Sequence, residues 1–238
     1  MEPDGGFMDG MNDIGTVYIT GGSSGLGAAV VSAVAKAGGT PGVIDRVPPE
    51  AGVAHSLADL AEAGDAERAV ADLVDQVGPP AAIVTAAGID ACGPLTEIER
   101  EAWERVVKVN LFGTVATVRA CLPHLERTRG TVVTVGSTLG LRALSDATAY
   151  CASKFGVVGF TRALAVELAG KVGVTLLIPG GMRTPFFDGR PEQYRPAPDA
   201  DLADPADIAE VVLGVLRQPR SCQVREIVVT PAQEPSWP

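Results

Sequence analysis

The sequence predicts an α/β protein in which helices cover both faces of a doubly wound parallel sheet. Short apolar runs rich in β-branched residues alternate with longer helical stretches. Strands that alternate with helices form β-α-β units, which build a parallel sheet. The strand runs are almost entirely apolar, as expected for strands buried on both faces. With 238 residues and no interior linker, the chain predicts a single domain.

The expected elements follow one another along the whole chain. The strand candidates are 16–20, 42–45, 82–85, 131–136, 174–178 and 226–229, with a weaker one at 53–56. Each is a short run of the residue types that strands prefer. The helix candidates are 26–37, 65–77, 101–122, 149–168 and 205–216. The last has a good start, because Asp204 precedes Pro205 and Asp207 lies in the first turn.

Two segments fall outside this alternation. Residues 1–13 are acidic and Gly-rich and lack the features of a secretion signal, so we expect a flexible tail before a domain at 14–238. Residues 181–203 are rich in Pro, Asp and Arg, with Phe186, Phe187 and Tyr194 among them. This segment is either an irregular surface loop or a lid over the substrate. We favour the lid, because it follows a strand at the sheet edge where ligands bind in such folds.

The bulk composition excludes several classes of function. The formal net charge of −10 disfavours a nucleic-acid partner, and no apolar run approaches the 18 residues of a membrane span. Two histidines and four cysteines without metal-type spacing predict no metal site. The cysteines are expected to be free thiols in a reducing compartment, which predicts a cytoplasmic protein.

A glycine-rich turn follows the first strand and opens the first helix. It runs from Thr20 to Gly27 and includes Gly21, Ser23, Ser24, Gly25 and Leu26. The glycines allow a tight turn, close approach of the backbone to a pyrophosphate, and packing of helix against strand. The N-terminus of the helix then presents N–H groups to the phosphates. The turn therefore predicts a dinucleotide site.

Asp45 ends the second strand, eighteen residues beyond Gly27. A carboxylate there accepts hydrogen bonds from ribose hydroxyls and repels a 2′-phosphate, which favours NAD over NADP. The neighbouring Arg46 could instead receive a 2′-phosphate. The alternative is that Asp45 is an ordinary turn acid before Pro48 and has no role in binding.

Tyr150 and Lys154 are four residues apart at the start of a helical stretch, so their side chains share one face. An ammonium beside a phenol lowers the phenol pKa and suits it to exchange a proton with a substrate oxygen. Ser137 ends the strand upstream and could bond the same oxygen. Asn110, in an apolar stretch of helix, must find polar partners, either as a core amide or in the site.

In these motifs the sequence resembles the short-chain dehydrogenase/reductase family, in its classical-length branch, from about residue 15 to 229. The pieces that match stand in family order: 20–27, Asp59-Leu60, Ala86-Ala87-Gly88, Asn110, Ser137, Tyr150 to Lys154, and Pro179-Gly180 through Met182 to Thr184. Their combination is far more specific than any one part.

The resemblance implies a single-domain Rossmann-type fold with about seven parallel strands. It implies Tyr150 as the acid/base, with Lys154 lowering its pKa and binding the nicotinamide ribose. Ser137 would position the substrate oxygen and Asn110 would support a water-linked proton path. Asp59 would bond the adenine amino group, with Leu60 beside it.

Two departures from the family pattern stand out. Thr85-Ala86-Ala87-Gly88 replaces the common Asn-Asn-Ala-Gly, so some sheet or cofactor support must come from backbone or from Thr85. The chain also ends in an unusual tail, 230–238, which could alter the substrate pocket or subunit contacts.

The sequence thus predicts an oxidoreductase that uses NAD, with NADP the rival, to interconvert a secondary alcohol and a ketone. Two alternatives remain: an NADP(H)-dependent ketoreductase of secondary metabolism, and a non-catalytic NAD(H) sensor. Apolar helices at 101–122 and 149–168 favour a homodimer or homotetramer, although a buried core helix looks similar. Arg183, Arg190 and Arg195 could bind an anionic substrate or simply be solvated.

Overall fold

The computed structural model describes residues 14–237, so the predicted tail at 1–13 lies outside the described residues. Seven parallel strands form one sheet in the order β3-β2-β1-β4-β5-β6-β7. The strand order reverses direction between β1 and β4, which is the topological switch point where ligands bind in open α/β sheets. The predicted doubly wound Rossmann-type fold is confirmed.

The strands are close to their predicted positions. They are β1 Thr16–Thr20, β2 Thr40–Asp45, β3 Ala54–Leu57, β4 Ala82–Thr85, β5 Thr131–Val135, β6 Gly173–Pro179 and β7 Glu226–Val229. The central strands are buried on both faces, which explains their continuous apolar sequence.

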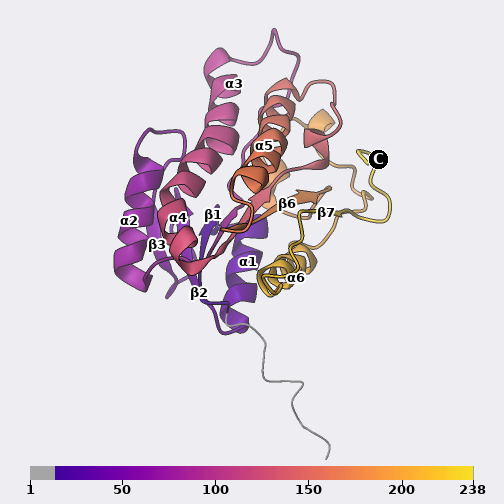
Figure 1. Ribbon diagram of the computed structural model, residues 1–238. Coiled ribbons are helices and arrows are strands. Elements are labelled where there is room, and N and C mark those ends of the chain that lie inside the picture. Colours follow the sequence, from indigo (N-terminus) through magenta and orange to yellow (C-terminus); the bar gives the residue numbers. More distant parts are fainter. Residues whose placement is uncertain (1–13, 238) are drawn as a thin grey trace, which may run out of the picture.

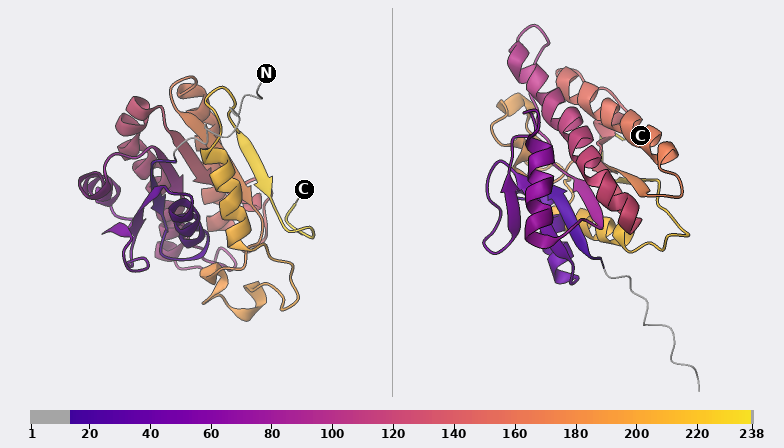
Figure 2. Two further views of the ribbon diagram at one scale, coloured as in Figure 1. Left: turned by 90° about the horizontal axis from the view of Figure 1, so that it is seen from below. Right: turned by 60° about the vertical axis from the view of Figure 1, so that its left-hand side comes forward.

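Helices cover the sheet on both sides (Figures 1 and 2). One face carries α1 Gly25–Lys36 and α6 Pro205–Leu216, which contact each other over Val17, Val84 and Val133. The other carries α2 Asp65–Val77, α4 Thr114–Thr128 and α5 Thr148–Glu167. Each face therefore buries its own apolar layer against the same sheet.

The predicted helix 101–122 is three segments: α3 Arg100–Val107, a π-helical turn Lys108–Gly113, and α4. Periodicity alone could not locate this interruption, because the apolar positions continue through it. By length and composition the run Arg100–Thr128 could cross a membrane, but 44% of its apolar window is buried, and a buried core helix meets the same criterion.

Candidate active site

One long cleft lies at the carboxyl ends of the strands and gathers most of the predicted residues. Its volume of about 1520 Å³ exceeds that of a pocket for one drug-sized ligand. The predicted residues that line it are Gly21, Ser24, Gly25, Leu26, Gly27, Asp45, Arg46, Asp59, Leu60, Ala86, Ala87, Gly88, Ser137, Tyr150, Lys154, Pro179, Gly180, Met182 and Thr184. Ser23 and Asn110 do not line it: Ser23 donates its hydroxyl to the carbonyl of Val47 at 2.7 Å, and Asn110 is buried.

The glycine turn forms a cradle that side chains would fill. Gly21 has a φ of +70°, and a Cβ there would lie 2.7 Å from the Cα of Ala87. A Cβ on Gly27 would overlap the carbonyl oxygen of Gly21. Ser24 makes no side-chain cap, so the first N–H groups of α1 are left to a ligand. The turn therefore fits a dinucleotide pyrophosphate.

Acidic groups end β2 and β3 at the far side of this turn. The Asp45 carboxylate accepts hydrogen bonds from the backbone N–H of Ser23 (3.0 Å) and of Arg46 (2.6 Å). Asp59 is bound by Arg105 at 2.6 Å and lies 3.8 Å from Arg46. Although partial burial opposes it, the hydrogen bond from Arg105 keeps the pKa of Asp59 below its usual value. Both carboxylates thus line the part of the cleft next to β2 and β3.

The loop after β4 is supported from an unexpected side. The Thr20 hydroxyl, in β1, accepts a 3.1 Å hydrogen bond from the backbone N–H of Ala87. Thr85, which the sequence suggested as a source of support, is buried, and its hydroxyl has no partner among the described residues. Among the described residues the hydrogen bond to this loop thus comes from Thr20 and not from Thr85.

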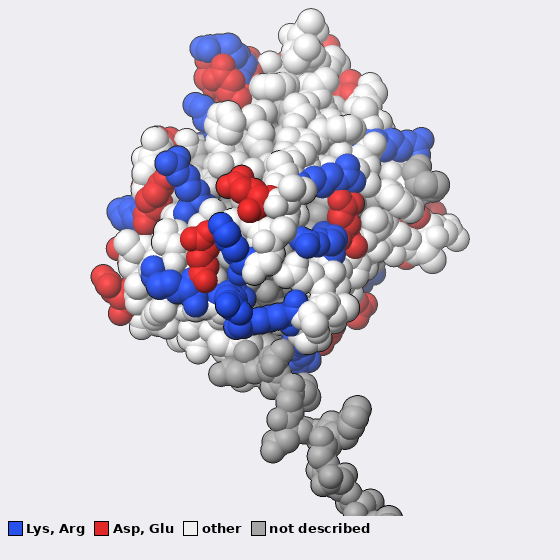
Figure 3. Space-filling view, in the orientation of Figure 1, with Lys and Arg blue, Asp and Glu red and all other residues white. Residues whose placement is uncertain are grey.

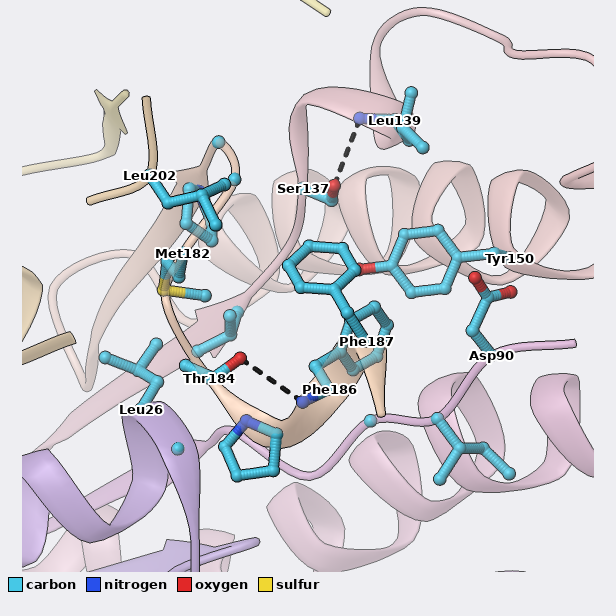
Figure 4. A pocket seen from close by; sticks show the side chains of 18 of the residues that line it. Leu26, Asp90, Ser137, Leu139, Tyr150, Met182, Thr184, Phe186, Phe187 and Leu202 are labelled. Carbon is cyan, nitrogen blue, oxygen red and sulfur yellow. Dashed lines mark hydrogen bonds between the residues drawn. The ribbon is translucent and has the colours of Figure 1, made fainter. Parts of the chain in front are cut away.

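Ser137, Tyr150 and Lys154 converge at the reacting end of the cleft. Ser137 follows β5, while Tyr150 and Lys154 lie one turn apart on α5. In Figure 4 Ser137 and Tyr150 line the same pocket, and the Ser137 hydroxyl accepts a 3.1 Å hydrogen bond from the N–H of Leu139. The Lys154 ammonium donates a 2.9 Å hydrogen bond to the carbonyl of Val135 and lies 5.6 Å from the Tyr150 ring centroid.

Burial shifts the pKa values of both Tyr150 and Lys154. It raises the pKa of Tyr150 to about 12, against a lowering contribution from the hydrogen bond with Ser137. Burial also lowers the pKa of Lys154 to about 8. The predicted lowering of the phenol pKa by Lys154 is not what this structure shows, because burial raises that pKa. The ring of Phe186 packs against Tyr150, with ring centroids 5.5 Å apart.

Asn110 lies in the π-helical turn, and its side-chain amide is fully engaged. It donates to the carbonyl of Ile89 (2.9 Å) and to the Ser153 hydroxyl (3.0 Å), and it accepts from the N–H of Ile89 (2.8 Å). The amide thus ties the loop after β4 to α5. A Cβ on Gly88 would lie 3.7 Å from the Asn110 amide oxygen and 3.8 Å from Lys154 Nζ, so these groups are near neighbours.

The segment 181–203 covers Tyr150 with residues that sequence reasoning did not combine. The Arg190 guanidinium lies over the rings of Phe186 and Phe187, at 4.9 and 4.7 Å from their centroids. It also forms an ion pair with Asp90, and Figure 4 shows Asp90 beside Tyr150. Asp90, two residues after Gly88, was missed; its position just past a strand end was the available signal.

A family match covers most of the chain that forms this fold. The short chain dehydrogenase profile matches residues 15–195, about three quarters of the chain. The chain belongs to the short-chain dehydrogenase family. Members of this family use NAD or NADP, and the cleft of this short-chain dehydrogenase has the matching glycine cradle.

Individual relatives agree with this assignment. The chain is 31% identical to 2-(S)-hydroxypropyl-CoM dehydrogenase 3 of Xanthobacter autotrophicus, over 84% of this chain and 88% of the relative. It is 32% identical to a putative ketoacyl reductase of Streptomyces coelicolor, over 91% and 89%. An alcohol dehydrogenase structure from Thermococcus sibiricus, complexed with 5-hydroxy-NADP, shares the fold with a TM-score of 0.82 at 24% identity, covering 94% of this chain and all of that one.

Proposed function

We propose that this short-chain dehydrogenase interconverts a secondary alcohol and a ketone with NAD as cofactor. The main support for this proposal is that Ser137, Tyr150 and Lys154 lie in the same cleft as the glycine cradle. A named dehydrogenase and a named reductase among the relatives support chemistry in either direction.

The side chains divide the work of proton transfer. A bound nicotinamide dinucleotide supplies or accepts the hydride. Tyr150 donates the proton to the substrate oxygen in reduction and removes it in oxidation. Ser137 hydrogen-bonds that oxygen, and Lys154 would bind the nicotinamide ribose. Asn110 acts behind them by fixing the loop after β4 against α5.

The adenosine end supports NAD over NADP. The Asp45 carboxylate places negative charge beside the glycine turn, where it would repel a 2′-phosphate. Arg46, which could attract such a phosphate, lies near Asp59 and is partly neutralised by it. The adenine amino group is assigned to Asp59 and Leu60, as the family resemblance implies.

The substrate is proposed to be uncharged near its reacting carbon. Arg190 is already paired with Asp90, and Phe186 contacts Tyr150, so the space around the phenol offers apolar and neutral surface. Arg183 donates to the Leu202 carbonyl and Arg195 to the Arg190 carbonyl, so these guanidinium groups also have partners.

Two measurements test the proposal. Tyr150→Phe should lower kcat by at least about 100-fold while NADH binding, followed by fluorescence, stays within about twofold. A variant with near-normal turnover in a screen of secondary alcohols and ketones would refute the role of Tyr150. For the cofactor, the unmodified protein should bind NADH more tightly than NADPH, and Asp45→Ala should narrow that difference; tighter NADPH binding by the unmodified protein would overturn the preference.

A further inference from the structure

The C-terminal tail after β7 forms one wall of the cleft. The lining residues from this segment are Thr230, Pro231, Ala232, Gln233, Glu234, Pro235, Ser236 and Trp237. Figures 1 and 2 show the tail continuing past the end of β7, where the neighbouring strand β6 also ends. The tail therefore meets the turn 179–181. This turn follows a strand at the sheet edge where ligands bind, and we expect its backbone to lie against the nicotinamide half of the cofactor.

Glu234 makes the central contact of this wall. One carboxylate oxygen accepts a 2.6 Å hydrogen bond from the backbone N–H of Gly181. The other accepts from the N–H (3.0 Å) and hydroxyl (2.6 Å) of Ser236. Although burial opposes it, the hydrogen bonds from Ser236 and Gly181 keep the pKa of Glu234 below its usual value, so the carboxylate is ionised at neutral pH.

The contact fixes a turn that has little rigidity of its own. Residues 180 and 181 are both glycine, the residue with the greatest backbone freedom. The Gly181 N–H is bound by Glu234, and its carbonyl accepts from the N–H of Ala203, at 3.0 Å. Glu234 is packed so closely that a Cβ on Gly180 would collide with its carboxylate.

A second contact joins the tail to the reacting centre. The Ser236 hydroxyl lies 2.6 Å from the hydroxyl of Thr138, the residue after Ser137. Arg142 also donates to the carbonyl of Pro235, at 3.2 Å. The tail thus connects the turn after β6 with the segment after β5. Glu234 binds Gly181 directly and reaches the segment after β5 only through Ser236, which contacts Thr138.

We propose that Glu234 is a positioning residue that holds the Gly180–Gly181 backbone in the conformation that receives the nicotinamide half of the cofactor. This inference rests on the proposed cofactor function. It predicts a defect confined to the nicotinamide end, because Asp45 ends β2, and three strands separate β2 from β6 in the sheet.

Comparison of NADH with ADP-ribose tests this directly, because ADP-ribose lacks the nicotinamide. By calorimetry, Glu234→Ala should weaken NADH binding at least about tenfold and leave ADP-ribose binding within about twofold. Glu234→Gln, which retains an oxygen for the Gly181 N–H, should give a smaller loss of NADH affinity. Glu210→Ala, at an exposed acid of α6, is the matched control and should change neither affinity.

Each other result overturns the proposal. Equal weakening of both ligands by Glu234→Ala would indicate a general structural role, and no weakening would show that the turn needs no support. If the unmodified protein binds NADH no better than ADP-ribose, the proposed function itself fails. Preference for NADH that persists in Glu234→Ala refutes the role of Glu234 alone.

Discussion

Arg190 Nη2 donates a 2.6 Å hydrogen bond to Oδ2 of Asp90, joining two segments that are 100 residues apart in the chain. The two side chains are only 17% and 6% exposed. This pair connects the segment 181–203 to the loop after β4, directly over Tyr150. It explains how a Pro- and Arg-rich segment covers the reacting end of the cleft.

The pair should contribute measurable coupling to stability. In a double-mutant cycle with Arg190→Ala and Asp90→Ala, urea unfolding should give a coupling free energy of about 1–3 kcal/mol, because both groups are largely removed from water. The exposed pair Arg100–Glu104 is the control, with side chains 75% and 42% exposed, and should give below about 0.5 kcal/mol. Equal coupling energies for the two pairs would contradict the inference that Arg190 and Asp90 hold the segment 181–203 against the loop after β4.

Thr20 and Thr85 should respond in opposite ways to the same substitution. Thr20→Val removes the acceptor for the Ala87 N–H and should lower the free energy of unfolding by about 1–3 kcal/mol. Thr85→Val removes a buried hydroxyl without a partner among the described residues, and should be neutral or stabilising. Chemical denaturation of the two variants provides the comparison; a larger loss for Thr85→Val would show that its hydroxyl is satisfied after all.

Lys154 should reduce stability at neutral pH. Its pKa of about 8 in the fold lies below its usual value of 10.5, so the unfolded chain binds more protons between these pH values. The free energy of unfolding should therefore rise as pH increases from about 8 to about 10.5. Below pH 8 the folded state carries the full cost, up to about 3 kcal/mol.

Lys154→Met tests this linkage. The variant should unfold at a higher temperature at pH 7, lose the rise in stability above pH 8, and lose turnover. Lys36→Met, at an exposed position of α1, is the control. The lost hydrogen bond to Val135 reduces the gain in stability but not the change in pH dependence. An unchanged pH dependence would show that Lys154 titrates normally.

We propose that the face around α5 binds a second copy of the chain. Phe112, Phe155 and Val166 are 60%, 46% and 78% exposed, and Figure 3 shows a largely uncharged area over α5 and toward α3. Phe155→Glu should shift the protein toward monomer in light scattering after gel filtration. Leu57→Glu, at the exposed β3 edge, should not; a monomeric unmodified protein would refute the interface.

Local sequence determined the strands, the helices and the glycine turn. The spacing of apolar residues predicted the observed bounds of β4, α2, α6 and β7. These patterns reflect hydrogen bonding and burial within a few residues of the chain. Local pattern also predicted that Tyr150 and Lys154 share one helix face, because they are four residues apart. It placed Ser137 near them, because Ser137 follows a strand.

Tertiary structure alone decided how these pieces are joined. Glu234 meets Gly181, and Asp90 meets Arg190, only because the carboxyl ends of several strands lie at one sheet edge. The direction of the Tyr150 pKa shift likewise depends on burial in the folded chain, where Phe186 from a distant segment packs against its ring. A sequence records which groups are available, whereas distances and burial between remote segments arise only when the chain has folded.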